Sequence, residues 1–405
     1  MTLISDNLKT KIEDLAIFGG KPLFSEKQHV GRPNLGDRTQ FLNRINDMLD
    51  LNWLTNRGPF VKEFEQKIAD YLGVKHCVSV CNATIALELA IRALELTGEV
   101  IIPSFTFIAT AHALQWQEIT PVFCDIDPIT HTIDPDKIES MITPRTTGII
   151  GVHVWGQPCN IEALTTIAKK HNLKLMFDAA HAMGCSYQGK MIGSFGDAEV
   201  LSFHATKFLN SFEGGAIVTN NDELAEKLIL MENFGFSGLD NVIYIGTNGK
   251  MSEVCAAMGL TSLESINEFI EINHQNYQCY QQELKDIKGI KLFTYNQQEQ
   301  CNYQYIVLEI DEEITNISRD KFVDILTAEN IIARRYFYPG CHRMQPYKSY
   351  FPHAGLLLPE TEKLSNKVML LPTGVNMNPD KIIKITDLIK FILDNTCSIA
   401  NKDNK

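Results

Sequence analysis

Two charged side chains each follow a strongly apolar run in this sequence. The stretch LKLMFDAAHAMG ends its apolar run with the carboxylate of Asp178, and AEVLSFHATK places the amine of Lys207 just past another such run. A lysine amine becomes a nucleophile when a partly apolar pocket lowers its pKa. A fixed carboxylate can hold a cationic ring. Taken singly, each residue also has an ordinary interpretation: Asp178 as a helix cap and Lys207 as an exposed loop lysine.

Other segments supply groups that could bind a phosphate and a ring. VCNATIAL at 80–87 is typical of a strand, a tight turn and a helix, so Ala83 and Thr84 would offer backbone N–H groups at a helix N-terminus, where phosphates bind. Ser202 could add a hydroxyl to the same phosphate. SFTFIAT places Phe107 just past the apolar run EVIIP. Each of these groups also has an ordinary interpretation. Residues 80–87 could form a plain turn, Ser202 could be a turn serine with its own hydrogen-bond partner, and Phe107 could be a core aromatic.

A phosphate turn, an aromatic face, a carboxylate and a lysine together match one cofactor, pyridoxal 5′-phosphate. The lysine would hold it as an imine. A carboxylate beside the pyridine nitrogen favours the protonated ring by about 1–3 pK units, each worth roughly 1.4 kcal/mol. The protonated ring is the electron sink that stabilises a carbanion. These residues therefore predict a single pyridoxal-phosphate site.

Alternating short apolar strands and helices must position these groups. We expect strands over 76–80, 99–104, 120–127, 147–154, 173–178, 198–204 and 214–220, and helices over 61–73, 83–96, 107–117 and 161–172. The alternation predicts the α/β class, with a large domain built on a mostly parallel seven-stranded sheet covered by helices on both faces. In such sheets ligands bind at the carboxyl ends of strands, where the polar residues of this chain collect.

The length of the chain and a change in its sequence pattern around Leu260 indicate two domains. With 405 residues and 44% hydrophobic content, it can bury the core of a large domain and of a smaller one. A long helical stretch around Leu260 leads into a final pattern of strands and helices. We predict an N-terminal arm at 1–30, a large domain at 31–265, a small α+β domain at 266–397, and a frayed tail at 398–405.

Composition excludes several classes of protein. The net charge of −12 without a basic block argues against nucleic acid as a partner. The ten cysteines form no CxxC pair, so neither a zinc ribbon nor a thioredoxin-type site is indicated, and we expect no metal site but free thiols in a reducing compartment. There is no apolar run long enough for a signal peptide or a membrane span. We expect a cytoplasmic protein without membrane partners.

Six long motifs occur in order along the chain. They are EVIIPSFTFIATAHAL, TPVFCDIDPITHTIDPDKIE, GIIGVHVWGQPCNIEAL, DAAHAMGCSYQGKMIGSFGDAEVLSFHATK, EGGAIVTNNDELAEKL and GTNGKMSEVCAAMGL. They resemble the DegT/DnrJ/EryC1/StrS family of sugar aminotransferases, and the resemblance runs from about residue 17 to residue 395. It implies a fold type I, aspartate-aminotransferase-like architecture and a homodimer with shared active sites.

The resemblance assigns roles to the cofactor residues. Lys207 matches the Schiff-base lysine of S-F-x-x-x-K, and Asp178 matches the carboxylate that faces the pyridine nitrogen in D-A-A-Q/H. Phe107 matches the aromatic that stacks on the ring. The phosphate cradle would comprise Ala83, Thr84 and Ser202. The family's usual S-G-T is here Cys81-Asn82-Ala83-Thr84, so contacts through backbone N–H groups should persist and the first hydroxyl is lost.

The resemblance also assigns roles to five further residues, some of which have an ordinary structural interpretation as well. His181 stands where the family usually has a Gln facing the phenolic oxygen of the cofactor; a histidine there can titrate near neutrality, and it could also be an ordinary satisfied histidine. Asn248 matches the Asn of N-x-R/K-M-x-E, which reaches the phosphate from the partner subunit. Tyr336, Phe337 and His342 resemble a substrate-facing loop, with ordinary packing as the alternative.

The resemblance also implies an activity. Related enzymes that dehydrate sugars carry His in place of Lys207, so the intact lysine favours transamination from an amino acid, expected to be glutamate, to a nucleotide-linked keto sugar. SFHATKFLNSFEGGAIVTN and IGTNGKMSE are most similar to enzymes that make dTDP-4-amino-4,6-dideoxyglucose. The alternatives are a 3-keto sugar or a keto-cyclitol as acceptor. A cofactor-binding regulator without turnover would carry a basic DNA-binding module, and none is visible.

Overall fold

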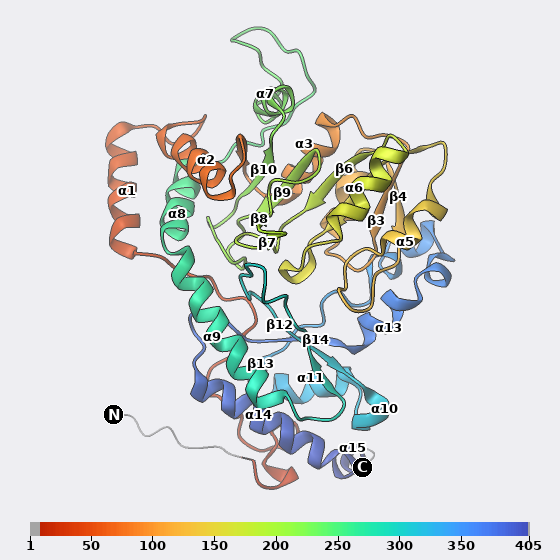
Figure 1. Ribbon diagram of the computed structural model, residues 1–405. Coiled ribbons are helices and arrows are strands. Elements are labelled where there is room, and N and C mark those ends of the chain that lie inside the picture. Colours follow the sequence, from red (N-terminus) through yellow and green to blue (C-terminus); the bar gives the residue numbers. More distant parts are fainter. Residues whose placement is uncertain (1–8, 404–405) are drawn as a thin grey trace.

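The computed structural model describes residues 9–403, so the parts of our predictions that fall on 1–8 and 404–405 lie outside the described residues. A large domain holds a seven-stranded sheet and a smaller domain lies below it in Figure 1. The large sheet comprises β2 (His76–Val80), β3 (Glu99–Pro103), β4 (Thr120–Cys124), β5 (Thr146–Val152), β6 (Lys174–Asp178), β9 (Ala198–Ser202) and β10 (Gly215–Thr219).

The strand order across the large sheet is β2-β10-β9-β6-β5-β3-β4. Every pairing is parallel except those of β10, which runs antiparallel to β2 and β9. The connection from β9 to β10 contains no crossover helix, and parallel neighbours need such a crossover. The α/β class and the mostly parallel seven-stranded sheet are therefore confirmed.

Helices cover both faces of this sheet. The helices of this half of the chain are α1 (Arg38–Leu51), α2 (Pro59–Leu72), α3 (Ala83–Ala93), α4 (Ala109–Gln115), α5 (Pro135–Ile138), α6 (Ile161–Lys170), α7 (Asp222–Met231) and α8 (Glu253–Glu264). Successive strand side chains point to opposite faces. Ile150 and Met176 accordingly lie in the apolar cluster with α3 and α4, whereas Ile149 and Phe177 lie in the cluster with α2 and α6.

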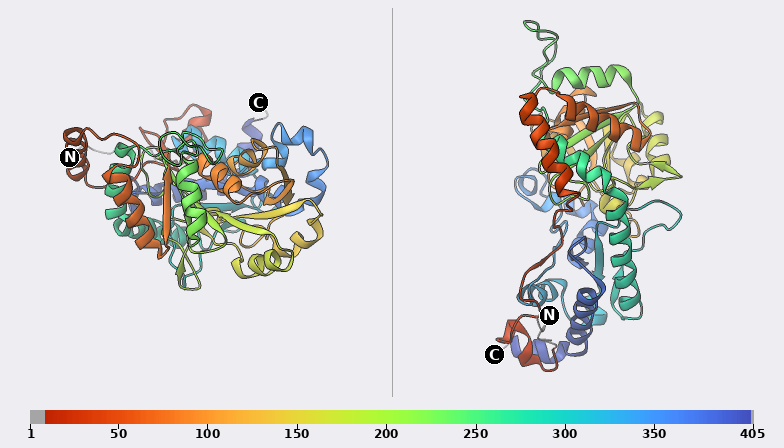
Figure 2. Two further views of the ribbon diagram at one scale, coloured as in Figure 1. Left: turned by 90° about the horizontal axis from the view of Figure 1, so that it is seen from above. Right: turned by 90° about the vertical axis from the view of Figure 1, so that its left-hand side faces the viewer.

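The smaller domain has a three-stranded antiparallel sheet in the order β11-β12-β14. Its strands are β11 (Ile290–Leu292), β12 (Ile306–Ile310) and β14 (Val368–Leu371). The helices after α8 are α9 (Ile266–Leu284), α10 (Glu312–Thr315), α11 (Arg319–Ala328), α12 (Tyr347–Tyr350), α13 (Pro359–Lys367), α14 (Pro379–Asp394) and α15 (Thr396–Asp403). Figure 2 shows α8 and α9 as a nearly continuous path between the domains, and we keep residue 265 as the proposed boundary.

The N-terminal segment is fastened to the smaller domain. The buried carboxylate of Glu329 accepts hydrogen bonds from the backbone N–H groups of Ala16 and Leu23, both at 2.7 Å. Lys9 forms an ion pair with the same carboxylate at 2.9 Å. Strand β1 (Gln28–His29) then pairs in parallel with β13 (Ile331–Ile332). Residues 28–34 are thereby carried towards the junction of the two domains.

The C-terminal segment differs from our prediction of a frayed tail at 398–405. Helix α15 continues to Asp403, and Ile399 is buried in the apolar core. The buried Ile399 and an ion pair of Lys402 with Glu13 at 2.7 Å fasten this helix, although the segment is otherwise polar. The prediction of fraying is wrong for the described part of this segment.

Candidate active site

The carboxyl ends of neighbouring strands bring the predicted cofactor residues to one edge of the sheet. Asp178 is the last residue of β6 and pairs with Val200, two residues before the end of β9 at Ser202. Gly215 begins β10 and is paired with Ser202 on one side and with Val80 on the other. The hydroxyl of Ser202, the carboxylate of Asp178 and the turn after Val80 therefore share one edge.

The turn after β2 forms a cradle of the kind that holds a phosphate. Asn82 caps α3 by accepting a hydrogen bond from the N–H of Ile85 at 2.9 Å. The N–H groups of Ala83 and Thr84 precede the first intrahelical bond and stay open to a ligand. Gly215 lies against this turn so closely that an added Cβ would sit 2.6 Å from the Ala83 nitrogen. Only glycine fits there, because any larger residue would displace the cradle.

Ser202 completes this cradle. It is buried, and its hydroxyl makes no hydrogen bond to any residue in the part of the chain that the structure describes. Its oxygen is not fully enclosed, so a phosphate oxygen can reach it and accept its hydrogen bond. Together with the open N–H groups at the start of α3, this hydroxyl fits a phosphate-bearing cofactor.

Asp178 is held firmly as an acceptor. Its side chain is buried, with Oδ2 accepting from the Thr110 hydroxyl at 2.8 Å and Oδ1 from the Ala180 N–H at 3.1 Å. Thr110 in turn contacts the hydroxyl of Thr106 at 3.0 Å. We did not predict Thr110 as a site residue, because a threonine inside an apolar helix gives no signal of its partner. It lies in the first turn of α4, which faces the strand ends.

Lys207 lies in the loop after β9, five residues past Ser202 in the sequence. Its backbone N–H donates to the carbonyl of His204 at 2.8 Å. Burial of the ammonium group lowers the pKa of Lys207 to about 8, although the negative charge of Asp178 acts in the opposite direction. A fraction of the amine is therefore neutral, and hence nucleophilic, close to neutral pH.

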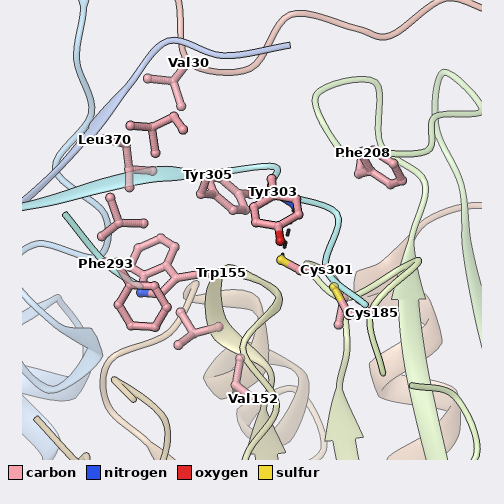
Figure 3. Packing of buried hydrophobic residues seen from close by; sticks show 14 of the residues in the cluster. Val30, Val152, Trp155, Cys185, Phe208, Phe293, Cys301, Tyr303, Tyr305 and Leu370 are labelled. Carbon is pink, nitrogen blue, oxygen red and sulfur yellow. Dashed lines mark hydrogen bonds between the residues drawn. The ribbon is translucent and has the colours of Figure 1, made fainter. Parts of the chain in front are cut away.

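His181 is fixed in one orientation behind Lys207. Its Nδ1 accepts the backbone N–H of Trp155 at 3.2 Å, so the neutral ring carries its proton on Nε2. Burial lowers the pKa of His181 well below its ordinary value, and the charge of Lys207 adds to this effect. The ring lies against Tyr305 at a centroid distance of 4.7 Å and stacks on Trp155. Figure 3 shows Trp155 and Tyr305 in the same apolar cluster.

This geometry makes His181 a hydrogen-bond donor that stays uncharged. Because the imidazole stays neutral, Nε2 can donate one hydrogen bond without changing charge. That capacity suits a residue facing the phenolic oxygen of the cofactor, the role that the family pattern assigns to this position. Trp155 was missing from our predicted site. Its backbone φ of 64° is unusual for a tryptophan, and no sequence pattern signals it.

The three aromatic residues of the predicted site lie in different environments. Phe107 precedes α4 and is 57% exposed, so it is not a core residue. Phe337 is buried and stacked between Trp155 and Tyr336, with ring centroids at 5.4 and 5.2 Å. Tyr336 lines the cavity that contains Lys207. Phe107 and Tyr336 are therefore free to contact a ligand, whereas Phe337 supports Tyr336 from behind.

His342 is engaged outside this cavity. Its Nδ1 contacts the hydroxyl of Ser104 at 2.7 Å, and its Nε2 contacts the carboxylate of Glu362 at the same distance. The ring is buried and does not line the cavity around Lys207. The structure thus gives His342 the packing role that we kept as the alternative to substrate contact.

Asn248 lies beside the phosphate turn of its own chain. The carbonyl of the next residue, Gly249, accepts the Cys81 N–H at 2.7 Å. The side chain of Asn248 is held by Lys250, whose Nζ donates to its Oδ1 at 2.8 Å and to Asn233 Oδ1 at the same distance. Asn248 also ends the long loop that follows α7 and projects from the molecule in Figure 1. Its contact with a phosphate stays a prediction.

Comparison with known proteins identifies the family. Residues 36–390 match the model of the DegT/DnrJ/EryC1/StrS aminotransferase family. The chain belongs to this family. It is 39% identical over 372 residues to dTDP-4-amino-4,6-dideoxy-D-glucose transaminase of Shigella dysenteriae, covering 92% of this chain and 99% of that protein. The Escherichia coli enzyme of the same name is 37% identical, with 89% and 97% covered.

Solved structures agree with the family assignment. DesI, determined in the presence of its TDP-sugar product, superposes with a TM-score of 0.94 at 46% identity, covering 98% of this chain and 100% of that chain. Helicobacter pylori PseC, an aminotransferase involved in pseudoaminic acid biosynthesis, superposes with a TM-score of 0.84 at 27% identity, with 90% and 99% covered. The protein is a DegT/DnrJ/EryC1/StrS aminotransferase with fold type I architecture, and its cofactor is pyridoxal 5′-phosphate.

The site residues fit this cofactor, and each of them would have a separate role in its chemistry. When bound, pyridoxal phosphate supplies the electron sink that stabilises negative charge on the carbon next to the transferred nitrogen. Asp178 would face the ring nitrogen, and the cradle at Ala83 and Ser202 would hold the phosphate. Lys207 would bind the cofactor covalently and, once released by the amino donor, would move a proton between the donor α-carbon and cofactor carbon C4′.

Cofactor loading should depend on pH through Lys207. We expect the rate of borohydride-trappable attachment to the apoprotein to rise about tenfold per pH unit below pH 8 and to level off above it, because only the neutral amine attacks and its pKa is about 8. Mass spectrometry of the peptide that contains Lys207 measures the rate. Lys207→Ala serves as the control, and a trapped adduct at the same peptide in that variant would contradict the assignment.

Asp178→Asn should lower the turnover of loaded enzyme by about 10- to 1000-fold, because a charge that shifts the ring pKa by about 1–3 units is removed. Thr110→Val removes one hydrogen bond to the same carboxylate and should have a smaller effect. Steady-state amination rates at saturating cofactor provide the comparison. An Asp178→Asn enzyme as active as the unmodified one would show that this carboxylate does not face the ring.

Proposed function

We propose that this aminotransferase moves an amino group from glutamate to a nucleotide-linked 4-keto-6-deoxy sugar, dTDP-4-keto-6-deoxyglucose, and so makes the corresponding 4-amino sugar. The observation that carries this proposal is the full-length similarity to DesI, whose structure was determined with a TDP-sugar product. The similarity covers both domains and the loops between them, and the transaminase of Shigella dysenteriae named above is related over nearly its whole length. The substrate proposal thus rests on entire enzymes rather than on one motif.

The site supports a transamination in particular. Lys207 is intact, and its lowered pKa provides the neutral amine that must accept a proton from the donor and return it to the acceptor. The exposed ring of Phe107 and the cavity-facing ring of Tyr336 offer apolar surfaces to a deoxy sugar or a base, and binding sites commonly combine such surfaces with a few polar groups. The nucleotide would supply binding energy remote from the reacting carbon.

We also propose that the enzyme acts as a homodimer with shared sites. The loop after α7 projects from the molecule (Figures 1 and 2) and exposes several large apolar side chains, with Leu239 93% exposed. Helix α1 also carries exposed Leu42 and Leu49. Apolar surface of this extent on a projecting element is typical of a contact between subunits.

We assign the enzyme to the cytoplasm. All ten cysteines lie in the described residues, and none forms a disulfide, as is usual in a reducing compartment. Among residues 9–403, no helix is long and apolar enough to cross a membrane. A nucleotide sugar as substrate agrees with this location.

The acceptor can be tested by competition among keto substrates. Each of dTDP-4-keto-6-deoxyglucose, its 3-keto isomer, a UDP-linked 4-keto sugar and a free keto-cyclitol is offered with glutamate, and the products are identified by mass spectrometry. We expect the highest kcat/KM for the first. Removing the nucleotide should reduce kcat as well as raise KM, because remote binding energy contributes to the transition state.

Each other outcome of that competition has a definite meaning. Preference for the 3-keto isomer would keep the reaction class and overturn the position of amination. Preference for the cyclitol would overturn the sugar substrate. A loaded enzyme that aminates none of the four would favour a regulator without turnover.

Shared sites can be tested with mixed dimers. Lys207→Ala and Asn248→Asp chains should each be inactive, and their mixture should regain activity if each site combines Lys207 of one chain with Asn248 of the other. Activity after subunit exchange, confirmed by native mass spectrometry, is the measurement. Exchange without recovery would show that Asn248 acts on the phosphate turn of its own chain, against which it lies in the structure.

A further inference from the structure

A buried histidine from a distant loop contacts the side chain of Trp155. His131 lies in the loop between β4 and α5, and its ring is fully buried. The ring packs against Phe105 and Phe293, at centroid distances of 6.3 and 4.9 Å. The Nε1–H of Trp155 donates a hydrogen bond to Nδ1 of His131 at 3.1 Å. One ring nitrogen of this histidine is thus committed to the indole of Trp155.

This hydrogen bond fixes the tautomer of His131. An indole N–H only donates, so Nδ1 of His131 is the acceptor and the ring proton lies on Nε2. That nitrogen is 3.5 Å from the carboxylate of Glu309 on β12 of the smaller domain, too far for a good hydrogen bond. Lys291 pairs with the same carboxylate at 2.7 Å. Within the described residues, the bond to Trp155 is therefore the one well-formed polar contact of the His131 ring.

Trp155 connects this histidine to His181. The peptide N–H of Trp155 donates to Nδ1 of His181 at 3.2 Å, which is the one hydrogen bond of that ring among the described residues. The indole also stacks on the His181 ring with an interplanar angle of 18°, inside the apolar cluster of Figure 3. The side chain of Trp155 thus contacts one histidine while its backbone holds the other.

The position of the His181 proton depends on the N–H of Trp155. When one nitrogen of a neutral imidazole accepts a hydrogen bond, the proton lies on the other nitrogen. The ring stays neutral because burial lowers the pKa of His181, and the charge of Lys207 adds to this effect. Without a donor at Nδ1 the proton would distribute over both nitrogens, and part of the molecules would lose the donor at Nε2.

We propose that His131 is a positioning residue for the transamination: it holds the indole of Trp155, and through the Trp155 backbone it keeps the proton of His181 on Nε2, towards the phenolic oxygen of the cofactor. Loss of the His131 acceptor leaves a fully buried indole N–H without a partner, which is unfavourable. The turn at Trp155 then rearranges, and its N–H no longer points at His181. This role is the same for any keto sugar that serves as acceptor.

The alternative is that His131 only fills space in the core. Two observations favour positioning. Phe105 and Phe293 would accommodate an apolar ring without the cost of burying two ring nitrogens. His131 and Trp155 also both have left-handed backbones, with φ of 61° and 64°, a conformation that costs energy for such residues and that clusters at functional sites.

The measurement is the pKa of the imine between Lys207 and the cofactor, obtained from the absorbance of the loaded enzyme against pH without substrates. In the protonated form, the imine nitrogen and the phenolic oxygen share one proton. A hydrogen bond from His181 to that oxygen draws negative charge away from the shared proton, and so lowers the pKa of the imine. Loss of the donor should therefore raise this pKa.

Four variants separate positioning from packing. His131→Phe keeps a ring and removes the acceptor, whereas His131→Gln keeps an acceptor. Trp155→Phe removes the donor at the other end of the same bond, and it decides the test if His131→Phe does not fold. His342→Phe is the matched control, because it removes another buried histidine with polar partners on both nitrogens, outside the cavity around Lys207.

We expect His131→Phe and Trp155→Phe each to raise the pKa of the imine by about one unit, the size expected for a weakened hydrogen bond to a charged group. His131→Gln should keep the pKa of the unmodified enzyme, because the indole retains an acceptor. His342→Phe should lower the thermal midpoint and leave the pKa of the imine unchanged.

A His181→Gln background provides the decisive comparison. A glutamine amide has its donor and its acceptor on different atoms and no tautomers, so its donor does not depend on the N–H of Trp155. In this background His131→Phe should no longer change the pKa of the imine. An unchanged pKa in loaded His131→Phe or Trp155→Phe would overturn the proposal. So would an equal shift in His342→Phe, or the full shift in the His181→Gln background.

Failure of the proposed function would look different. The titration contains neither an amino donor nor a sugar, so an enzyme that aminates none of the offered keto sugars would still show the shifts expected here. Circular dichroism and the absorbance of the bound cofactor confirm that each variant is folded and loaded before the comparison.

Discussion

The site depends on two opposing effects at one amine. Burial of Lys207 favours its neutral form, while the carboxylate of Asp178 favours the charged form, and the balance leaves a pKa of about 8. Without burial the amine would stay protonated at neutral pH; without the carboxylate the pyridine nitrogen would have no counter-charge. Both conditions are met because Asp178 terminates a central strand and Lys207 lies in the loop after the adjacent one. The sheet thus fixes the electrostatics of the reaction.

A second group of residues holds the charged and hydrogen-bonding groups of the site in fixed orientations. Thr110 holds the carboxylate of Asp178, and the backbone of Trp155 holds the ring of His181. Neither residue needs to touch the reacting atoms. Their effect is to set which atoms donate and which accept before any ligand arrives, and such preorganisation avoids reorganisation during the reaction. The close approach of Gly215 to the Ala83 turn does the same for the phosphate.

The second domain and the N-terminal segment turn this strand edge into an enclosed site. Gln304 of the smaller domain donates to the carbonyl of Thr206 at 3.2 Å, and Asn34 donates to that of Phe208. The loop that carries Lys207 is therefore fastened from two sides by chain segments remote from it in sequence.

The layers of the fold and the main catalytic groups could be predicted from the sequence. Alternating apolar runs predicted the seven-stranded sheet, because strand and helix periodicities are local properties. Asp178, Lys207 and Ser202 were placed at strand ends because parallel strands deliver their carboxyl ends to one edge. Together with Ala83, Thr84 and Phe107, they already predicted pyridoxal 5′-phosphate, and the family motifs added the sugar-aminotransferase activity. The prediction of a frayed tail was wrong because the buried Ile399 and the ion pair of Lys402 with Glu13 hold a helix that composition alone does not predict.

Which side chains meet across long distances in the chain became visible only in the folded structure. Thr110 reaches Asp178, at the end of β6, from helix α4, and His342 is bound by Ser104 and Glu362 rather than lining the cavity around Lys207. These contacts depend on packing between elements, which leaves no periodic signal in the sequence. The cavity that Lys207 lines is of the same kind: its residues become neighbours only because the N-terminal segment pairs with β13 and the smaller domain packs against the loop of Lys207.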